Sequence, residues 1–386
     1  MVTLLSELPK YNWDVEVVCM ASTKFPTSSV DGKGEYKRKG EHRGVKFRYT
    51  SLCVKASKML ISRTISGLWG IMMLPVVILF IKIKHRKQSV ILLTNLTQGH
   101  YVTYLKLISL LVSARYVLVR SEYPSLIRKR TKLTRLYELL LEMRIFKHFD
   151  GFALMTNTLI DYFKPISKRN SKFELIPMTV DIHRFSRNFG SPFDFKYIAY
   201  AGSLSNEKDG VDILIKSFLR IAAHHPNIHL VIVGDTSKSD FYAKLSFIIQ
   251  NEGANFQERI HFTERIDASL IPQYLTNATI LALARPDSKQ AQGGFPTKLG
   301  EYLATGKPVI VTRVGEIPNY LSHRKNAILC EPGSVNDFTK HLDWILQNEQ
   351  LQPQIGNAGK EVACKIFNSE VQGKRFDSFL QQFITN

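Results

Sequence analysis

A glycine-rich segment that leads into a short helical pattern could bind a phosphate group. The residues GGFPTKLGEYLATGK occupy positions 293–307. Pro296 suits the first position of a helix, where no amide proton is needed, and the amides of Thr297 and Lys298 then have no partner inside the helix. Together with the helix dipole, such amides favour an anion. We therefore expect a diphosphate seat here, on a helix that ends in a left-handed cap at Gly306.

Glu301 lies one turn inside this predicted helix. Side chains on a helix lean toward its start, so the carboxylate reaches back toward the expected phosphate. That placement is repulsive unless the carboxylate accepts protons from a neighbouring group, and a ribose diol offers two such hydroxyls. The pattern then indicates a nucleotide. The alternative is an ordinary capped helix that leads into a strand, which the spacing alone favours.

A second segment, YIAYAGSLSNEKDGVDILIKSF at 197–218, reads as a strand, a glycine turn, a polar loop and a helix. Gly202 allows close approach of a ligand to the backbone, and Lys208 supplies a positive charge. In parallel sheets, ligands bind beyond the carboxyl ends of the strands, where both segments are expected to lie. Taken without this context, Lys208 is a solvated loop lysine.

Strands and helices alternate along the chain, which is typical of parallel sheets covered by helices. The expected strands are residues 15–19, 90–94, 116–120, 197–201, 229–233, 260–262, 280–284 and 309–312. Three helices are expected between strands of the second half, at 211–223, 241–250 and 271–275. We predict two α/β units with a hinge at 175–190, and a long mobile loop at 24–48. The first 19 residues read as a helix and then a strand, so no initial strand with its glycine turn is evident: either the start is placed late or the first sheet lacks an element.

The excess positive charge is concentrated in one half of the chain. The net charge is +19, and residues 1–180 hold 30 Lys and Arg against 12 Asp and Glu, whereas residues 181–386 hold 22 against 21. A basic half suits an anionic membrane surface, an acidic substrate or nucleic acid. Nucleic acid fits least, because the basic residues are scattered and no aromatic-interleaved motif accompanies them.

The four cysteines are far apart and form no CxxC motif, which favours a reducing compartment. The first ten residues lack the pattern of a secretory signal. The most apolar stretch, 65–81, is shorter than the roughly 20 residues that span a bilayer and contains Pro75. We expect a buried helix of the first domain; a helix lying in a membrane surface is the next choice.

The chain resembles the retaining glycosyltransferases of family 4, which have the GT-B fold. The similar segments are LIPMTVDIHRF (175–185), 197–218, HLVIVGD (229–235), IHFTERI (260–266), 293–321 and NAILCEPGSVNDF (326–338), with fainter likeness at 116–127 and 137–157. The resemblance implies two Rossmann-like domains with parallel sheets facing a cleft. Their expected bounds are 1–180 for a basic, membrane-facing acceptor domain and 181–365 for the nucleotide-sugar domain, with 366–386 a helix packing back on the first domain.

The resemblance also implies roles for particular residues. Lys208 and Glu301 would be the catalytic pair, binding diphosphate and ribose respectively. Donor-binding residues would be Gly202, Ser203, Arg265, Ile266, Arg285, Gly294, Phe295, Pro296, Thr297, Lys298 and Leu299. The family needs no metal or other cofactor, and no zinc or magnesium ligand cluster is evident in the sequence.

Three positions depart from the family pattern. An earlier glutamate that contacts the donor sugar in the family is Gly293 here, and Asp287, Ser288 or Gln292 could substitute for it. An arginine that often follows the Gly202 position is Ser203, and Arg285 could supply that charge. The third departure is the missing first strand with its glycine loop. On the acceptor side, His100, Arg120 and Glu122 follow strand ends and could face the cleft.

The leading interpretation is a cytoplasmic enzyme, peripherally attached to the inner face of the membrane. It would transfer a hexose-type sugar from a nucleotide diphosphate to a glycan or lipid-linked acceptor, as in cell-surface polysaccharide synthesis. A nucleotide-sugar 2-epimerase of the same layout would need no acceptor cleft or membrane face. A non-catalytic relative is the third interpretation, because the first strand and the earlier glutamate are missing.

Overall fold

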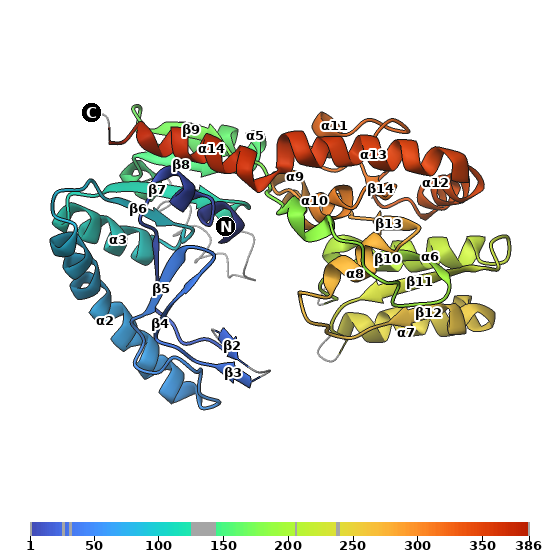
Figure 1. Ribbon diagram of the computed structural model, residues 1–386, viewed down its shortest axis with the longest axis horizontal. Coiled ribbons are helices and arrows are strands. Elements are labelled where there is room, and N and C mark those ends of the chain that lie inside the picture. Colours follow the sequence, from blue (N-terminus) through green and yellow to red (C-terminus); the bar gives the residue numbers. More distant parts are fainter. Residues whose placement is uncertain are drawn as a thin grey trace.

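Two α/β domains lie side by side and are joined by two crossings of the chain (Figure 1). The computed structural model describes residues 2–24, 28–30, 33–124, 144–204, 207–236 and 240–384. The first crossing lies between strands β9 (Lys172–Leu175) and β10 (Lys196–Ala201), and includes the 3-10 helix η5 (Ile182–Phe185). The second lies at Asn368, which precedes the last helix.

The C-terminal domain is built on one parallel sheet of six strands, in the order β12-β11-β10-β13-β14-β15. Besides β10, these are β11 (Ile228–Val233), β12 (Ile260–Phe262), β13 (Ile280–Leu283), β14 (Val309–Thr312) and β15 (Ile328–Cys330). Their side chains are almost all buried, as apolar runs covered on both faces should be. The order reverses between β10 and β13, and such a switch point is where open parallel sheets bind ligands.

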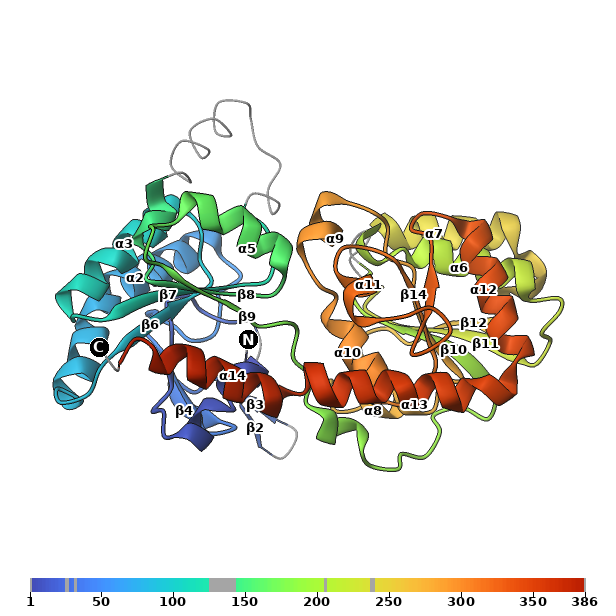
Figure 2. The same ribbon diagram turned by 90° about the horizontal axis from the view of Figure 1, so that it is seen from above.

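Helices cover both faces of this sheet (Figure 2). They are α6 (Val211–Ile221), α7 (Asp240–Glu252), α8 (Ile271–Thr276), α9 (Lys289–Gly293), α10 (Thr297–Ala304), α11 (Ile317–Tyr320), α12 (Val335–Gln347) and α13 (Gln352–Val362). The strands and helices expected in this half are all present, displaced by a residue or two at their ends. The strand β15 and helices α9, α12 and α13 add to the prediction.

The N-terminal domain has a four-stranded parallel sheet and a separate three-stranded sheet. The larger has the order β6-β7-β8-β9, with β6 (Ile91–Thr94), β7 (Arg115–Arg120) and β8 (Gly151–Leu154). The smaller has the order β1-β5-β4, with β1 (Glu16–Cys19), β5 (Val45–Tyr49) and β4 (Lys39–His42). Strands β8 and β9 were not foreseen, because GFAL and KFEL are only four residues long.

The two N-terminal sheets belong to one layer that is interrupted between β1 and β6. Val17 packs in the same hydrophobic cluster as Ile91 and Leu93. Val18, which points to the opposite face, shares a second cluster with Leu92. Among the described residues, β1 and β6 make no strand pair with each other. The chain therefore enters this domain through helix α1 (Val2–Leu5), 3-10 helix η1 (Leu8–Tyr11) and then β1, in the order that the sequence predicts.

The prediction of a long mobile loop at 24–48 is wrong for the part of this segment that the structure describes. Strand β4 pairs with β5 in an antiparallel hairpin, and β2 (Ser28–Val30) pairs with β3 (Lys33–Glu35). Arg43 and Gly44, with φ of 52° and 77°, form the two-residue turn between His42 and Val45. Positive φ at both central residues matches the twist of a hairpin. An Arg-Gly turn is a weaker sequence signal than Asn-Gly, which is why the hairpin was missed.

The apolar stretch forms one long helix, α2 (Leu60–Lys84), but the expectation that it is buried is wrong. Only Ser66, Gly70, Leu74 and Ile78 are buried, because they lie four residues apart on the single face that packs against the domain. The other apolar side chains of α2 are largely exposed. This helix is long and apolar enough to cross a membrane, by length and composition alone.

Helix α14 (Ser369–Gln381) leaves the C-terminal domain and crosses the first domain, where it packs against α1 and η1 (Figure 2). Phe376 and Phe379 from α14, followed by Phe383, share a buried cluster with Leu4, Leu5 and Leu8. Polar contacts reinforce the packing: the Ser369 hydroxyl donates to Glu7 at 3.1 Å, and the Trp13 indole to Asp377 at 2.7 Å. The last helix is therefore part of the first domain's core.

Candidate functional site

Two loops meet at the switch point of the C-terminal sheet. One follows β10 and carries Gly202 and Lys208; the other precedes helix α10. A Cβ at Gly202 would lie 2.1 Å from Cε of Lys298, so only glycine allows the lysine to cross the loop there. Gly210 (φ 65°) is similarly constrained, because a Cβ there would come as close to the carbonyl oxygen of Ala284, just after β13. The structure thus brings these two predicted loops together.

An ion pair fastens the two loops to each other. The Lys298 ammonium lies 2.6 Å from Asp209, and the Tyr200 hydroxyl donates to the same carboxylate at 2.8 Å. Burial raises the pKa of Asp209, but the charge of Lys298 and these hydrogen bonds outweigh burial, so the pKa is lowered overall. Asp209 is therefore a buried anion that fixes Lys298. Sequence reasoning missed it because its partners are distant in the chain.

Lys208 reaches across the gap between the domains. Its ammonium lies 2.9 Å from the carboxylate of Glu122, which follows β7 of the N-terminal domain, and Gln290 of α9 donates to the other carboxylate oxygen at 3.3 Å. Burial raises the pKa of Glu122, but the Lys208 contact more than compensates and the pKa is lowered. Glu122, predicted on the acceptor side, thus contacts the predicted donor loop.

Arg120 holds the backbone that presents Glu122. Its guanidinium donates to the carbonyls of Glu122 at 2.8 Å and Asn95 at 2.9 Å, and more weakly to that of Tyr123. Burial lowers the pKa of Arg120. Arg120 is therefore committed to main-chain contacts. Its part at this site is to position the Glu122 loop.

Arg285 is the most deeply buried cation of the site, with 2% of its surface exposed. Its Nε has no hydrogen-bond partner among the described residues. Burial lowers its pKa, while the nearby carboxylates of Asp209 and Glu122 act in the opposite direction. The side chain thus lies within electrostatic reach of both anions, the one that binds Lys298 and the one that binds Lys208. That Arg285 supplies the charge that Ser203 lacks stays a prediction.

Glu301 faces another cation, Arg184, from the segment that links the domains. The two side chains form an ion pair at 2.8 Å, and Arg184 also donates to the carbonyl of Ala268 at 3.0 Å. Ala268 follows Arg265 and Ile266, of which the first is exposed and the second half-buried. Arg184 therefore connects the predicted ribose residue to the segment that carries the predicted donor-binding residues Arg265 and Ile266. Sequence reasoning missed this residue, since nothing in its spacing marks it.

Helix α10 begins at Thr297, one residue later than predicted, and Pro296 is its N-cap. No side chain caps this end, so the first amides are offered outward, as a phosphate seat requires. Gly306, with φ of 78°, follows the helix as the predicted left-handed cap. Phe295 and Leu299 are buried and anchor the helix, and Gly294 N donates to Gln290 O at 3.1 Å.

Gly293, where the family has a glutamate, packs directly against the other domain. A Cβ there would lie 2.1 Å from the Tyr123 ring, and the Gly293 carbonyl accepts from the Thr156 hydroxyl at 3.0 Å. Of the suggested substitutes, Ser288 caps α9 by accepting from Ala291 N, and Asp287 bonds to Gln292 at 3.0 Å. Glu122 is the carboxylate that lies against this segment, with its Cγ 3.6 Å from the Cβ position of Gly294.

His100 is not brought to this cluster by any contact recorded among the described residues. It is exposed at the start of α3 (Gly99–Leu111), where its ring lies 4.3 Å from that of Tyr101. The structure therefore gives no support to a role for His100 at the site. A strand end followed by a histidine is a common loop pattern, which made it a weak signal from the start.

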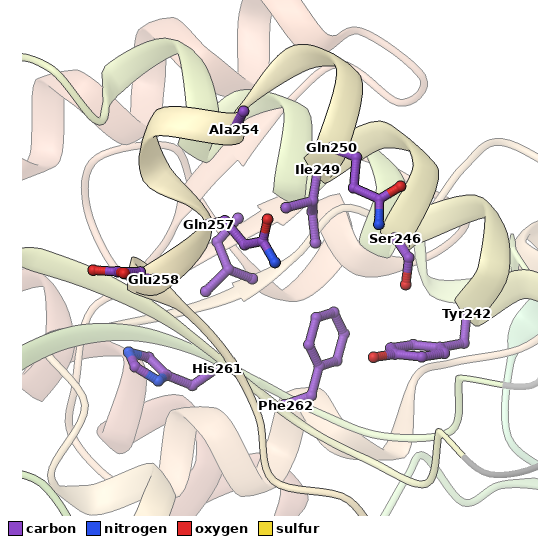
Figure 3. Close-up of a pocket in the computed structure, with 10 residues that line it drawn as sticks. Tyr242, Ser246, Ile249, Gln250, Ala254, Gln257, Glu258, His261 and Phe262 are labelled. Atoms are coloured by element: carbon purple, nitrogen blue, oxygen red, sulfur yellow. The ribbon is translucent and has the colours of Figure 1, made fainter.

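A hollow of about 710 Å³ lies elsewhere, between α7, the 3-10 helix η7 (Ala254–Arg259) and β12 (Figure 3). Its lining includes Tyr242, Gln250, Gln257, His261 and Phe262 and none of the predicted site residues. This hollow lies at the β12 edge of the sheet. The charged cluster lies instead at the switch point between β10 and β13. We place the functional site at the charged cluster because it gathers the groups that can bind a phosphate.

Comparison with known proteins assigns the fold and then the family. The architecture of two such domains facing each other is the GT-B fold. A sucrose-phosphate synthase from Thermosynechococcus elongatus matches with a TM-score of 0.69 at 16% identity, over 99% of this chain and 92% of that one. HepE from Anabaena, solved in complex with UDP, matches with a TM-score of 0.66 at 15% identity, over 88% and 87% of the two chains.

The family model described as Glycosyl transferases group 1 matches residues 181–362, which make up most of the C-terminal domain. A curated relative named "Uncharacterized glycosyltransferase MJ1178", from Methanocaldococcus jannaschii, is 26% identical over 173 residues. The match covers 45% of this chain and 44% of that protein. The chain thus spans about half the length of the curated relatives that it matches. The predicted resemblance to glycosyltransferases of the GT-B fold is confirmed, whereas family 4 and its retaining mechanism stay predictions.

Proposed function

We propose that this protein is a glycosyltransferase that uses a nucleotide-diphosphate sugar as its donor. The observation that carries the proposal is the cluster at the switch point. Lys208, Lys298 and Arg285 gather there beside the uncapped start of α10, and Glu301 lies one turn further along that helix. Positive charges and free amides suit a diphosphate, and a carboxylate beside them suits a ribose. The UDP bound to HepE and the names of the relatives support this reading.

The chemistry that follows is the departure of a sugar from its diphosphate. Negative charge grows on the leaving phosphate, so cations and amides already in position lower the barrier without reorganisation. We propose that the transfer proceeds with retention, the acceptor attacking on the face from which the phosphate leaves and the phosphate taking its proton. In this scheme Lys208 and Lys298 stabilise the phosphates, and Glu301 and Arg184 hold the ribose end.

Glu122 gives the donor-free enzyme a specific electrostatic state. Its carboxylate lies at Lys208, where we propose that the diphosphate binds. Two anions cannot share one ammonium without repulsion, so donor binding displaces the carboxylate or turns it toward the sugar. In the second case Glu122 would supply, from the opposite domain, a carboxylate near the position that Gly293 leaves without one.

We propose a glycan or lipid-linked acceptor, in a cytoplasmic enzyme of cell-surface polysaccharide synthesis. The basic first half, with 30 Lys and Arg against 12 Asp and Glu, favours an anionic acceptor or surface. Once Glu122 is displaced, the three side-chain cations less the buried Asp209 leave a net charge of about +2, which can balance the two charges of a sugar-linked diphosphate without a metal ion. We therefore expect transfer to continue in EDTA, which would stop a transferase that depends on a divalent metal.

The test of the donor site is a thermal-shift screen against nucleoside mono- and diphosphates, because a ligand of the native state raises its apparent stability. A diphosphate of one base should raise the melting temperature more than the matching monophosphate. Glu301→Ala and Lys208→Ala should abolish most of that shift. Lys216→Ala is the matched control, since Lys216 is also ion-paired and its side chain is as exposed, at 35%.

No shift with any nucleoside diphosphate, or equal shifts in the wild type and both variants, would refute the proposed site. Product analysis then separates transfer from epimerisation. A glycosyltransferase yields a glycosylated acceptor with the free nucleoside diphosphate, whereas an epimerase converts the donor into an isomer without any acceptor.

A further inference from the structure

We propose that the exposed sides of α2 and α3 form a docking face for an anionic phospholipid bilayer. The face is defined by apolar side chains that are largely exposed to solvent. It comprises Ile61, Ile65, Leu68, Met72, Val76, Leu79 and Ile83 of α2, with Leu107, Leu110 and Leu111 of α3. Soluble proteins rarely leave so continuous an apolar patch uncovered, and such patches mark interaction sites.

The residues of the docking face form one stripe along α2. Successive members from Ile61 to Ile83 are three or four residues apart, which places them on one side of a helix. The opposite side is packed into the domain. A Cβ at Gly70, for example, would lie 2.0 Å from the carbonyl oxygen of Met20. The helix is therefore held to the protein by one side while the other is free, which suits a helix lying in a surface better than one crossing a bilayer.

The backbone carbonyl of α2 that lacks a partner within the helix is paired by a neighbouring side chain. Pro75 has no amide proton, so the carbonyl of Ile71 loses its partner within the helix. The hydroxyl of Tyr104, on α3, donates a hydrogen bond to that carbonyl. An unpaired carbonyl would be costly beside lipid, and this contact both satisfies it and ties the two helices of the docking face together.

Charge selects an anionic bilayer as the occupant. Residues 42–121, which contain the whole docking face, hold 13 Lys and Arg and no Asp or Glu. Exposed cations lie at both ends of α2: Lys55 and Lys58 precede it, and Lys84, Arg86 and Lys87 end or follow it. A helix parallel to the membrane brings both ends to the headgroups, where basic side chains are attracted to anionic lipid. Two copies of this face would repel each other.

The surrounding contacts do not cancel this charge. The acidic residue recorded at the end of α2 is Asp14, 3.6 Å from His85, and it is already paired with Lys46 at 2.7 Å. The docking face also lies on the side of the N-terminal domain that faces away from the C-terminal domain (Figures 1 and 2). Docking therefore leaves the charged cluster at the switch point uncovered.

The proposal can be tested by flotation of the whole chain with lipid vesicles. Wild-type protein should float with vesicles of phosphatidylcholine mixed with phosphatidylglycerol at low salt, and bind much less to phosphatidylcholine alone. High salt should weaken binding, because screening reduces the headgroup attraction. The double variant Met72→Glu/Val76→Glu should lower the partition coefficient by about tenfold or more, since charges replace inserted apolar groups.

The matched control is Phe247→Glu in the C-terminal domain. Phe247 is 66% exposed and Met72 is 60% exposed, so both substitutions place a charge at an exposed apolar position. Only the α2 variant should lose vesicle binding. A second variant, Lys84→Gln/Arg86→Gln/Lys87→Gln, should reduce binding to anionic vesicles while leaving the apolar stripe intact.

Three results would overturn the proposal: no flotation with anionic vesicles, binding that ignores lipid charge and salt, or equal loss with Phe247→Glu. A vesicle-free dimer that the Met72→Glu/Val76→Glu variant dissociates would instead assign the face to a second copy of the chain. None of these readouts depends on the donor site. Failure here would therefore leave the proposed sugar transfer untouched, and the nucleotide screen tests that separately.

Discussion

The two domains share an α/β architecture but differ in the continuity of their sheets, in their charge and in their exposed apolar surface. The C-terminal domain has one continuous sheet of six strands, nearly balanced charge and a single large core. The N-terminal domain has its sheet in two pieces, most of the net charge and an apolar helix face turned to solvent. This difference matches the two roles that we propose, donor binding for the second domain and membrane docking for the first.

The burial of the strands differs between the two domains in the same way. The residues of β13 and β14 are all buried, whereas those of β1 are all half-buried. A strand covered on both faces and both edges is fixed by its neighbours, while β1 is paired on one edge only among the described strands. The N-terminal domain must therefore take stability from elsewhere, and helix α14 is where it does so.

The largest expected effect tests this dependence. Phe376 of α14 is fully buried against Leu4 and Leu5, and Phe376→Ala should destabilise the N-terminal domain by about 3–5 kcal/mol. Amide hydrogen exchange should show lost protection in β7 and β8 but not in β10 and β11. The matched variant is Phe338→Ala, from the core of the C-terminal domain. Phe338→Ala should lower protection in β10 and β11 but not in β7 and β8. Equal loss of protection in both domains for either variant would show that the two domains unfold as one unit.

The second prediction concerns the bridge between the domains. Lys208→Ala should lower kcat about 10²–10³-fold, because it removes a charge aimed at the leaving phosphate. The measurement is initial rate with saturating donor, with Lys216→Ala as the control that should retain wild-type turnover. If the loss appears only in KM, Lys208 binds the ground state and does not act on the leaving group.

A smaller effect of opposite sign is expected at the other end of the same ion pair. Glu122→Gln removes the carboxylate that competes with a diphosphate for Lys208, so the nucleoside diphosphate should bind roughly three- to tenfold more tightly, or about 1 kcal/mol. Isothermal titration of wild type and variant measures this directly. Weaker binding in the variant would mean that Glu122 assists the donor and does not compete with it.

The smallest effect is a pH dependence at the contact between Glu316 and the N-terminal domain. Glu316 is buried and accepts from Thr158 N at 3.1 Å. Burial raises its pKa, so the folded state binds this proton more tightly than the unfolded state does. That stabilisation is complete below the ordinary carboxyl pKa and is lost as pH rises through the raised value. Glu316→Gln should therefore reduce the fall in unfolding free energy over this range, and an unchanged slope in chemical denaturation would exclude Glu316 as its cause.

The sequence predicted the C-terminal domain well because its strands are buried on both sides. Runs such as the one at 228–233 are continuously apolar, and each is followed by a turn or a helical pattern. The same reasoning placed Gly202, Lys298 and Glu301 at one edge of the sheet. Such features are local, so each can be predicted from a single segment of the chain.

What the sequence could not show depends on contacts between distant segments. The Lys208–Glu122 pair joins residues 86 positions apart, and Arg184–Glu301 joins residues 117 apart. Glu122 was expected to face an acceptor because its position after β7 says nothing of which loop lies opposite. The side of α2 left uncovered was equally hidden, since apolar periodicity is the same whether a protein or a lipid covers it.

Helix α14 also has a consequence for the order of events during synthesis. Domains that are contiguous in sequence can fold as the ribosome releases them, the first before the second. Here the first domain needs Phe376, Phe379 and Phe383 for its core, and these emerge only after the whole second domain. The second domain can therefore fold first, while the nascent first domain keeps part of its apolar interior exposed until α14 has been synthesised.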